Sequence, residues 1–513
     1  METIHTKTAW GILLSLALVK TTLHFLVNLQ DNFFRDEFYY IACGQHPDFG
    51  YVDHPPLVAV LAALSHLLWG DSVFTLRIFP TLAGAASVLL AGLLAKEFGG
   101  NRFAQTLAAL AVLVNPGYLA LHGFFSMNAF DQLFWLLAAY FLVSGIQRNK
   151  PRLWIWFGII LGLGLMNKIS MLFFGFGITL GLLLSPARRL FLNPWLWASA
   201  GIAFLIFLPH ILWQIAYDFP TREFIHNATM YKNMPLSPLQ FIWAQMLENN
   251  LLLVPFWLGG LIWLLYRGKE QPYQALGWMY LIVLLFLITQ RGKPYYLAPA
   301  YSILFSAGAV AVEHGIQKFH RSGMQVGFQI AICLLLTISG ILFAPFALPI
   351  LSPENFLRYA SALGIETPET ERHEQGVLPQ FFADRHGWEE MVATVASVYQ
   401  QLTPEEQKRC TIIAGNYGEA GAIDHFGKHY GLPNAICSHN SYFLWGPGQA
   451  TGEITIAFGI AKGDLDKAFD EVHEMARIYH PLSMPYESNL PVYLCRNPRV
   501  SLQEIWHRTK NYN

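Results

Sequence analysis

Long apolar runs recur along the first two thirds of the chain. Each run holds about 15 to 22 residues, enough for a helix to cross a hydrocarbon layer of about 30 Å. The pattern predicts eleven spans, at residues 9–27, 74–95, 104–121, 130–147, 153–167, 169–185, 195–214, 246–266, 274–290, 295–313 and 326–346. We interpret the shorter apolar run from Pro55 to Trp69 as an interfacial or re-entrant helix. The first run ends without a small-residue cleavage site, so we expect it to be retained as a span.

The pattern changes at Ser352, where the apolar spans stop. Residues 354–374 are charged and contain proline, which is typical of a linker. Beyond them, periodicity predicts helices at 388–402 and 465–479 and strands at 410–414, 453–458 and 492–495. We therefore predict an all-α polytopic membrane bundle of about eleven transmembrane helices over residues 1–350. A linker and a small soluble α/β domain follow over residues 351–513.

A glycine-rich stretch, Gly415–Gly421, follows the first of these strands and resembles a phosphate loop. It lacks the GxGxxG spacing and a Lys-Ser/Thr pair, so we favour a tight strand-to-helix turn.

Composition agrees with a membrane protein, since 54% of the 513 residues are apolar and only 13% are charged. The net charge of -1 argues against a nucleic-acid partner, which would need a surplus of lysine and arginine. The five cysteines are widely and irregularly spaced, so they predict neither a metal knuckle nor a disulfide framework. A single disulfide among Cys410, Cys437 and Cys495 stays open at this stage.

Positive charges predict the orientation, because cytoplasmic connections retain lysine and arginine. With the N-terminus inside, every inner connection carries at least two basic residues. These are Lys7, Lys96, Arg102, Arg148, Lys150, Arg152, Arg188, Arg189, Arg267, Lys269, Lys318 and Arg321. Eleven spans then place the tail outside, which in the inner membrane of a Gram-negative cell is the periplasm.

Acidic residues gather on the predicted outer side. Asp36 and Glu37 follow the first span, and Asp53 and His54 precede two prolines and the short apolar run. Charges beside the hydrocarbon layer are costly unless they face a cavity or a partner, so they indicate a functional site. The structural alternative is a solvated loop in which Asp36 caps the next helix. The prolines would hold Asp53 and His54 at a defined angle, where they could also bind a divalent metal ion.

Cations and amides occur at other outer edges. Asn128 and Asp131 begin the fourth span, Lys168 lies in a break between two apolar runs, and Arg291 and Lys293 precede the tenth span. For each cation alone, snorkelling of the side chain to the interface explains the position. Together, on one side and beside acids, they favour a site for an anionic head group.

Four motifs resemble one family. They are Asp36-Glu37-x-x-Tyr40, Tyr51-x-Asp53-His54-Pro55-Pro56-Leu57, Gly164-x-x-x-x-Lys168 and Arg291-Gly292-Lys293-Pro294-x-Tyr296-x-x-Pro299-Ala300-Tyr301. In this order they resemble the bacterial membrane glycosyltransferases of family 39 type, in the GT-C superfamily. Relatives of these enzymes are the protein O-mannosyltransferases and the aminoarabinose transferase that modifies lipid A. The chain departs from the family before the fourth span, where Met127-Asn128-Ala129 replaces Thr-Pro-Asp and Asp131 lies three positions later.

The resemblance implies a reaction. A sugar would move, with inversion, from a polyprenyl-phosphate donor in the outer leaflet to a lipid, glycan or protein acceptor. Asp36, with Glu37 beside it, would serve as general base or orient the acceptor, which suits a carboxylate partly removed from water.

The resemblance also implies partners for the donor. Lys168, Arg291, Lys293 and Tyr296 would bind the donor phosphate. Asp53 and His54 would bind a metal ion or the donor, and Asn128 and Asp131 are secondary candidates.

Two other classes of protein compete with this hypothesis. A transporter or flippase for lipid-linked sugars would also need a charged cavity, but alternating access usually leaves internal repeats and ionisable groups near the midplane. A structural subunit that presents the C-terminal domain to partners would leave the paired acids unexplained. We favour the transferase, and the family resemblance contributes most of this preference.

Overall fold

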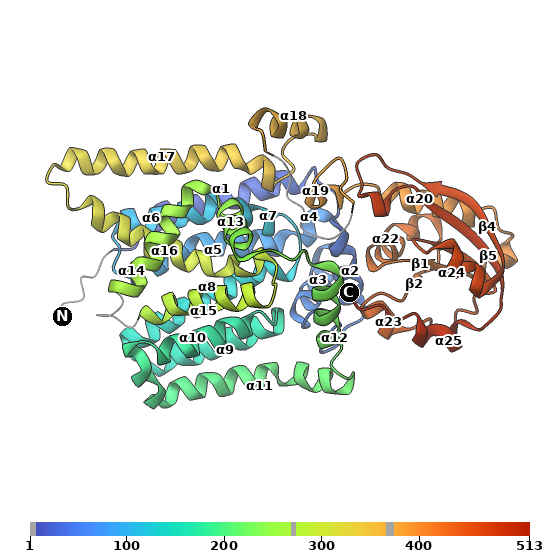
Figure 1. The fold of residues 1–513 in the computed structure, drawn as a ribbon, viewed down its shortest axis with the longest axis horizontal. Coiled ribbons are helices and arrows are strands. Elements are labelled where there is room, and N and C mark those ends of the chain that lie inside the picture. The colour runs from blue at the N-terminus through green and yellow to red at the C-terminus, as the bar shows by residue number, and fades with distance from the viewer. Residues whose placement is uncertain (1–6, 268–272, 366–373) are drawn as a thin grey trace.

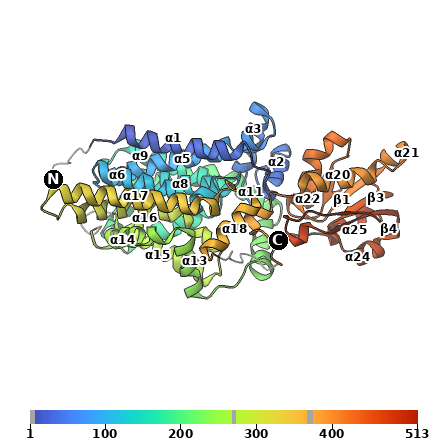
Figure 2. The ribbon, with the colours of Figure 1, turned by 90° about the horizontal axis from the view of Figure 1, so that it is seen from above.

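The structure is a computed structural model that describes residues 7–267, 273–365 and 374–513. Lys269 and residues 366–373 of the predicted linker lie outside these ranges. The helices of the first part run side by side along the long axis, and the C-terminal region, defined as residues 374–513, lies at one end of them (Figure 1). The two parts are also separated along the long axis in the second view (Figure 2).

The described helices confirm a polytopic membrane bundle. Six of them are long and apolar enough to span a membrane, two further pairs are sharply bent, and four are shorter and apolar. The long ones are α1 (Trp10–Asn28), α4 with α5 (Val73–Leu76 and Ile78–Glu97), α8 (Met127–Arg148), α11 (Pro194–Ala216), η5 with α16 (Pro294–Leu297 and Ala298–Ile316) and α17 (Ser322–Ala347). The bent pairs are α10 with η1 (Met171–Leu183 and Pro186–Leu192) and α13 with η3 and α14 (Pro238–Glu248, Leu251–Leu253 and Val254–Tyr266). The shorter ones are α3 (Leu57–Trp69), α6 (Arg102–Val114), α9 (Pro151–Asn167) and α15 (Gln274–Thr289). Eleven spans stays a prediction.

Short helices connect these elements. They are α2 (Arg35–Gln45), α7 (Pro116–Leu121), α12 (Pro220–Asn227), η2 (Ala228–Lys232) and α18 (Pro353–Leu363). Of these, α2 and α12 lie with α3 between the bundle and the C-terminal region (Figure 1). Connections α5–α6, α8–α9 and α16–α17, which carry predicted inner basic residues, lie at the opposite end (Figure 1).

Glycines allow the closest helix approaches in the bundle. A Cβ on Gly308 of α16 would lie 2.1 Å from the carbonyl oxygen of Phe256 on α14, and one on Gly260 would lie 2.0 Å from that of Leu304. Because neither position has room for a side chain, α14 and α16 pack backbone against backbone, as small residues permit in membrane helices.

The C-terminal region contains a five-stranded sheet with strand order β2-β1-β3-β5-β4. Its strands are β1 (Cys410–Ala414), β2 (Ala435–Cys437), β3 (Ile454–Phe458), β4 (Phe469–Ile478) and β5 (Leu490–Pro498). β1 pairs in parallel with β2 and β3, while β5 pairs antiparallel with β3 and β4. Its helices are α19 (Gln380–Ala383), α20 (Trp388–Tyr399), α21 (Pro404–Gln407), α22 (Tyr417–Phe426), α23 (Ser441–Trp445), α24 (Lys462–Ala468) and α25 (Leu502–Ile505). Figure 2 shows α20 and α22 on one side of the sheet and α24 on the other.

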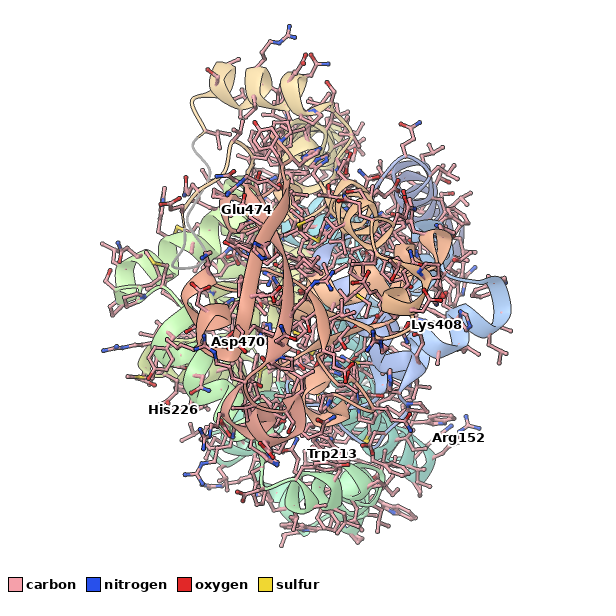
Figure 3. The ribbon with its side chains drawn as sticks, turned by 90° about the vertical axis from the view of Figure 1, so that its right-hand side faces the viewer. Arg152, Trp213, His226, Lys408, Asp470 and Glu474 are labelled. Atoms are coloured by element: carbon pink, nitrogen blue, oxygen red, sulfur yellow. The ribbon has the colours of Figure 1, made fainter. Side chains whose placement is uncertain are left out.

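One predicted element is wrong. The helix expected at 465–479 ends at Ala468, and the residues after it form β4 at the edge of the sheet. Glu474, Met475 and Arg477 are good helix formers, but pairing with β5 overrides local propensity. Seen from the C-terminal side, Asp470 and Glu474 of this strand lie in front of the helices (Figure 3).

The apolar core does not stop at the predicted domain boundary. One buried cluster joins Phe38 and Cys43 of α2 to Trp388 and Val392 of α20 and Ile412 of β1. The division at residue 350 stays a prediction, and the bundle and the C-terminal region share a packed interface. All five cysteines are free, so the disulfide left open among the last three is absent.

Candidate active site

Glu37 is buried and fully paired at the start of α2. Its carboxylate accepts hydrogen bonds from the backbone N–H of Phe34 at 2.7 Å and of Phe125 at 2.6 Å. Nε and Nη2 of Arg77, itself fully buried, donate to the two oxygens at 2.7 Å each. Four charge-assisted bonds leave this carboxylate no free side. This geometry fits a structural role for Glu37, and the catalytic role predicted for it stays a prediction.

Asp36 is the acid that stays accessible. It lies one residue earlier on α2 and is half-buried. Its Oδ1 accepts a hydrogen bond of 2.8 Å from the hydroxyl of Tyr417, the first residue of α22 in the C-terminal region. Among the described residues no other donor contacts this carboxylate, so Oδ2 can still accept a proton or a hydrogen bond. Asp36 therefore has the geometry of a general base, whereas Glu37 does not.

Asp53 and His54 lie close to the same helix. The Tyr39 hydroxyl on α2 donates to Asp53 Oδ1 at 2.7 Å. The buried His54 ring stacks on Tyr51 with centroids 4.8 Å apart. Burial lowers the pKa of His54, and the carboxylates of Asp53 and Asp36 oppose this shift from nearby. The two acids and the imidazole thus form one cluster.

The hydrogen bonds of His54 define its chemistry. Nδ1 lies 2.8 Å from the carbonyl oxygen of Pro55, which can only accept, so we assign the proton to Nδ1. Nε2 of the neutral ring then carries a lone pair. This atom is buried and has no hydrogen-bond partner among the described residues. It could accept a hydroxyl or N–H group of a bound molecule.

Lys168 follows α9 at the break before α10 and is nearly buried. Its Nζ donates to Asn128 Oδ1 at 2.7 Å and lies 3.8 Å from Asp131 Oδ2. The ammonium also lies over the ring of Tyr296, 4.8 Å from the centroid. The secondary candidates Asn128 and Asp131 are therefore the partners of the lysine, and Tyr296 completes its surroundings.

Arg291 and Lys293 lie in the turn between α15 and η5. Arg291 is exposed and has a φ of 54°, and Lys293 is the N-cap residue of η5, which contains Tyr296. The turn is bonded to the bundle through Gln245, which donates to the carbonyl oxygen of Pro294 at 2.9 Å. These two cations thus immediately precede η5, the helix whose Tyr296 contacts Lys168.

The residues 125–128 connect the acids with Lys168. The N–H of Phe125 binds Glu37, the carbonyl oxygen of Met127 accepts from Asn167 at 2.9 Å, and Asn128 binds Lys168. Four elements distant in sequence therefore meet at this end of the bundle: α2, the start of α8, the break after α9, and η5. The sequence predicted the members of this set but not their contacts.

Sequence reasoning missed several residues of the site. Arg77, Tyr39, Tyr417 and Ser441 contact the acids or their immediate partners. Arg77 belongs to a run that reads as the start of a span. Tyr39 and Tyr417 lie within the first motif and the glycine-rich stretch but at positions given no role there, and Ser441 belongs to no motif. Only spatial proximity identifies them.

Comparisons with known proteins show what the chain is similar to. Residues 53–213 match the family model described as dolichyl-phosphate-mannose-protein mannosyltransferase. The chain is 25% identical over 340 residues to the lipid A galacturonosyltransferase RgtD of Rhizobium johnstonii, covering 64% of this chain and 68% of that protein.

Solved structures show the same fold. ArnT from Cupriavidus metallidurans in the apo state has a TM-score of 0.62 and 14% identity, covering 94% of this chain and 97% of that one. The same protein bound to undecaprenyl phosphate has a TM-score of 0.60 and 14% identity, over 95% and 98% of the two chains. The chain has the fold of ArnT and is similar over residues 53–213 to the mannosyltransferase family model. The predicted family, enzyme class and fold class are thereby confirmed, while the roles of individual residues stay predictions.

A metal ion does not fit the cluster of Asp53 and His54 well. In the described ranges, no group of three or more His, Cys, Asp or Glu side chains is suited to hold one. Asp53 already accepts from Tyr39, and His54 directs Nδ1 to a backbone carbonyl. We therefore derive no step that passes through a metal at Asp53 and His54.

Proposed function

We propose that this glycosyltransferase moves a sugar from a polyprenyl-phosphate donor to a hydroxyl group of a lipid acceptor at the non-cytoplasmic face of the inner membrane. One observation carries the proposal: residues 125–128 hold the acid-bearing helix α2 and the cation Lys168 at the same end of an apolar bundle. A base and a phosphate ligand beside lipid are what such a donor requires. The names of the relatives, which refer to lipid A and to undecaprenyl phosphate, support a lipid acceptor and this donor class.

The proposed step uses this chain's own residues. Asp36 accepts the proton of the acceptor hydroxyl while that oxygen attacks the anomeric carbon. The bond between the anomeric carbon and the phosphate oxygen breaks with inversion, and the polyprenyl phosphate leaves with the electron pair. Lys168 stabilises the negative charge that grows on this phosphate, and Arg291, Lys293 and Tyr296 contribute from the adjoining turn.

The orientation of the chain is part of the proposal. The basic connections lie at the end of the bundle opposite the C-terminal region (Figure 1). Because cytoplasmic connections retain positive charge, this supports a cytoplasmic N-terminus and a periplasmic C-terminal region. The acids and Lys168 then lie on the outer side.

Transfer of a labelled sugar from a polyprenyl-phosphate donor, in membranes that contain the protein, tests the proposal. Asp36→Asn should lower turnover by about 10²- to 10⁴-fold, the usual contribution of a general base. Asp71→Asn is a matched control, because Asp71 is an acid after α3 that pairs with His66 at 2.8 Å. It should leave turnover unchanged. Equal turnover of Asp36→Asn and wild type would contradict the proposed role of Asp36.

The donor side has its own test. Lys168→Gln removes the charge but keeps a hydrogen bond to Asn128 available, so it should weaken transfer because the leaving phosphate loses a cation. Lys168→Arg should retain more activity than Lys168→Gln. Indistinguishable rates for the two variants would mean that charge at this position does not stabilise the phosphate.

A further inference from the structure

The C-terminal region reaches both outer acids of the bundle. Tyr417 donates to Asp36 Oδ1 at 2.8 Å. Ser441 Oγ lies 2.7 Å from the hydroxyl of Tyr39, which binds Asp53. A phenol has one proton and a carboxylate can only accept, so Tyr39 donates to Asp53 and Ser441 donates to Tyr39.

We propose that the C-terminal region is an integral part of the catalytic site, and that Tyr417 is a positioning residue that orients Asp36 for proton transfer. This inference rests on the proposed function of Asp36. It assigns to residues 374–513 a role that neither their composition nor their distance in sequence from Asp36 indicates.

The packing of α22 on α2 fixes the position of Tyr417. A Cβ on Gly421 would lie 2.7 Å from Cβ of Phe38, and one on Gly418 would lie 2.6 Å from Cγ of Arg35. The glycines that resembled a phosphate loop therefore let one helix lie directly on the other. Because the two helices touch so closely, the hydroxyl at the start of α22 meets the carboxylate at the start of α2.

The guanidinium of Arg35 on α2 packs against the ring of Tyr417. Its guanidinium carbon lies 5.1 Å from the centroid of the Tyr417 ring and 5.4 Å from that of Tyr486. Its Nε lies 3.6 Å from Glu487, which is buried in the C-terminal region. A cation between two aromatic faces and beside a carboxylate is well fixed. The tyrosine is therefore held by α2 and by its own helix together.

The chemistry of the pair suits a base. Burial and the charge of Asp36 raise the pKa of Tyr417 well above its ordinary value, so the phenol stays protonated and acts as a donor. The bond occupies Oδ1 and stops rotation of the carboxylate, which directs Oδ2 toward an acceptor hydroxyl. Preorganised orientation of this kind accelerates a reaction without contact with the substrate.

The variant Tyr417→Phe tests the proposal in the full-length protein. It removes one hydroxyl and keeps the ring under Arg35. We expect kcat to fall about 10- to 100-fold, the range for a hydrogen bond to a charged group, with KM for the donor within about twofold of wild type. The matched control is Tyr442→Phe, which removes a comparable bond of 2.7 Å from Tyr442 to Asp424 in the same region. It should leave kcat within about twofold.

A double-variant cycle separates positioning from a loss of folded protein. In the Asp36→Glu background the longer carboxylate no longer meets Tyr417, so Tyr417→Phe should have less than about a third of its effect in wild type. If Tyr417 had a purely structural role, Tyr417→Phe would lower kcat by the same factor in wild type and in the Asp36→Glu background. That result would overturn the proposal. An unchanged kcat of Tyr417→Phe would also overturn it.

Two further comparisons complete the test. If Tyr417→Phe does not fold, Ser441→Ala decides: a lower kcat supports positioning by the C-terminal region, and an unchanged kcat contradicts it. If Asp36→Asn is fully active, the proposed function itself fails. If Asp36→Asn is inactive while Tyr417→Phe equals wild type, only the present inference fails.

Discussion

Replacing Glu37 by glutamine should unfold the protein more readily, whereas replacing its neighbour Asp36 by asparagine should not. Glu37 accepts from two backbone N–H groups and from two nitrogens of Arg77. An amide offers only one acceptor oxygen, and its NH₂ group would face a donor. Removing one partner of a buried ion pair typically costs about 3 to 5 kcal/mol, and because Arg77 keeps Asp31 as a second partner we expect a value near the lower end.

Asp36→Asn perturbs much less. The amide oxygen can still accept the hydroxyl of Tyr417, so only the charge of the bond is lost, a change of about 1 kcal/mol. Thermal unfolding of the purified proteins in detergent, followed by tryptophan fluorescence, compares the two variants with wild type. We expect a clear drop in melting temperature for Glu37→Gln and almost none for Asp36→Asn.

If Glu37→Gln melts like wild type yet has lost transfer activity, Glu37 does not have the structural role assigned to it. That result would return Glu37 to the catalytic role that the sequence predicted. If both variants melt early, Asp36 would share the structural role, and loss of turnover in Asp36→Asn could no longer be read as loss of a base.

Two other predictions concern stability. Burial raises the pKa of Asp384 to about 7 from an ordinary value near 3.8, so between about pH 4 and 7 the folded state binds more protons and stability falls as pH rises. Asp384→Asn should remove this decline, worth at most about 4 kcal/mol, and melting temperatures at pH 5 and 7.5 should differ less than in wild type; an equal difference would contradict the assignment. Gly308→Ala should cost about 1 to 3 kcal/mol because the new Cβ would meet the Phe256 carbonyl, whereas Gly315→Ala, with no atom within 4 Å, should be neutral. Equal melting temperatures for these two variants would show that α14 and α16 can separate without cost.

The bundle was predictable because a membrane imposes one strong rule on sequence. Apolar runs must be long enough to cross the hydrocarbon layer, and the predicted starts and ends of α1, α8 and α9 lie within three residues of those observed. The rule fails where a span is broken. The run at 104–121 is interrupted at Asn115, whose side chain caps α7, and hydrophobicity alone cannot reveal such a break.

The sequence predicted which residues belong to the candidate site but not which of them contact one another. The sequence identified Asp36, Lys168 and Asn128 as separate outer-edge residues, and the structure links them through residues 125–128. It could not distinguish the roles of Asp36 and Glu37, because their difference depends on Arg77, which lies 40 residues away in sequence. Adjacent positions on a helix point about 100° apart, so two neighbouring acids rarely share one environment.

The change of composition at Ser352 does not by itself define a domain boundary. It marks where the surface of the protein stops facing lipid and begins to face water, since hydropathy reports on the solvent outside. It does not mark where packing stops, because Phe38 of α2 lies in the same buried cluster as Trp388 and Ile412. A helix that carries the proposed base on one side and this apolar core on the other cannot keep its orientation without the C-terminal region. The sheet therefore serves the chemistry through packing, even though its strands contribute no residue to the acids' immediate contacts.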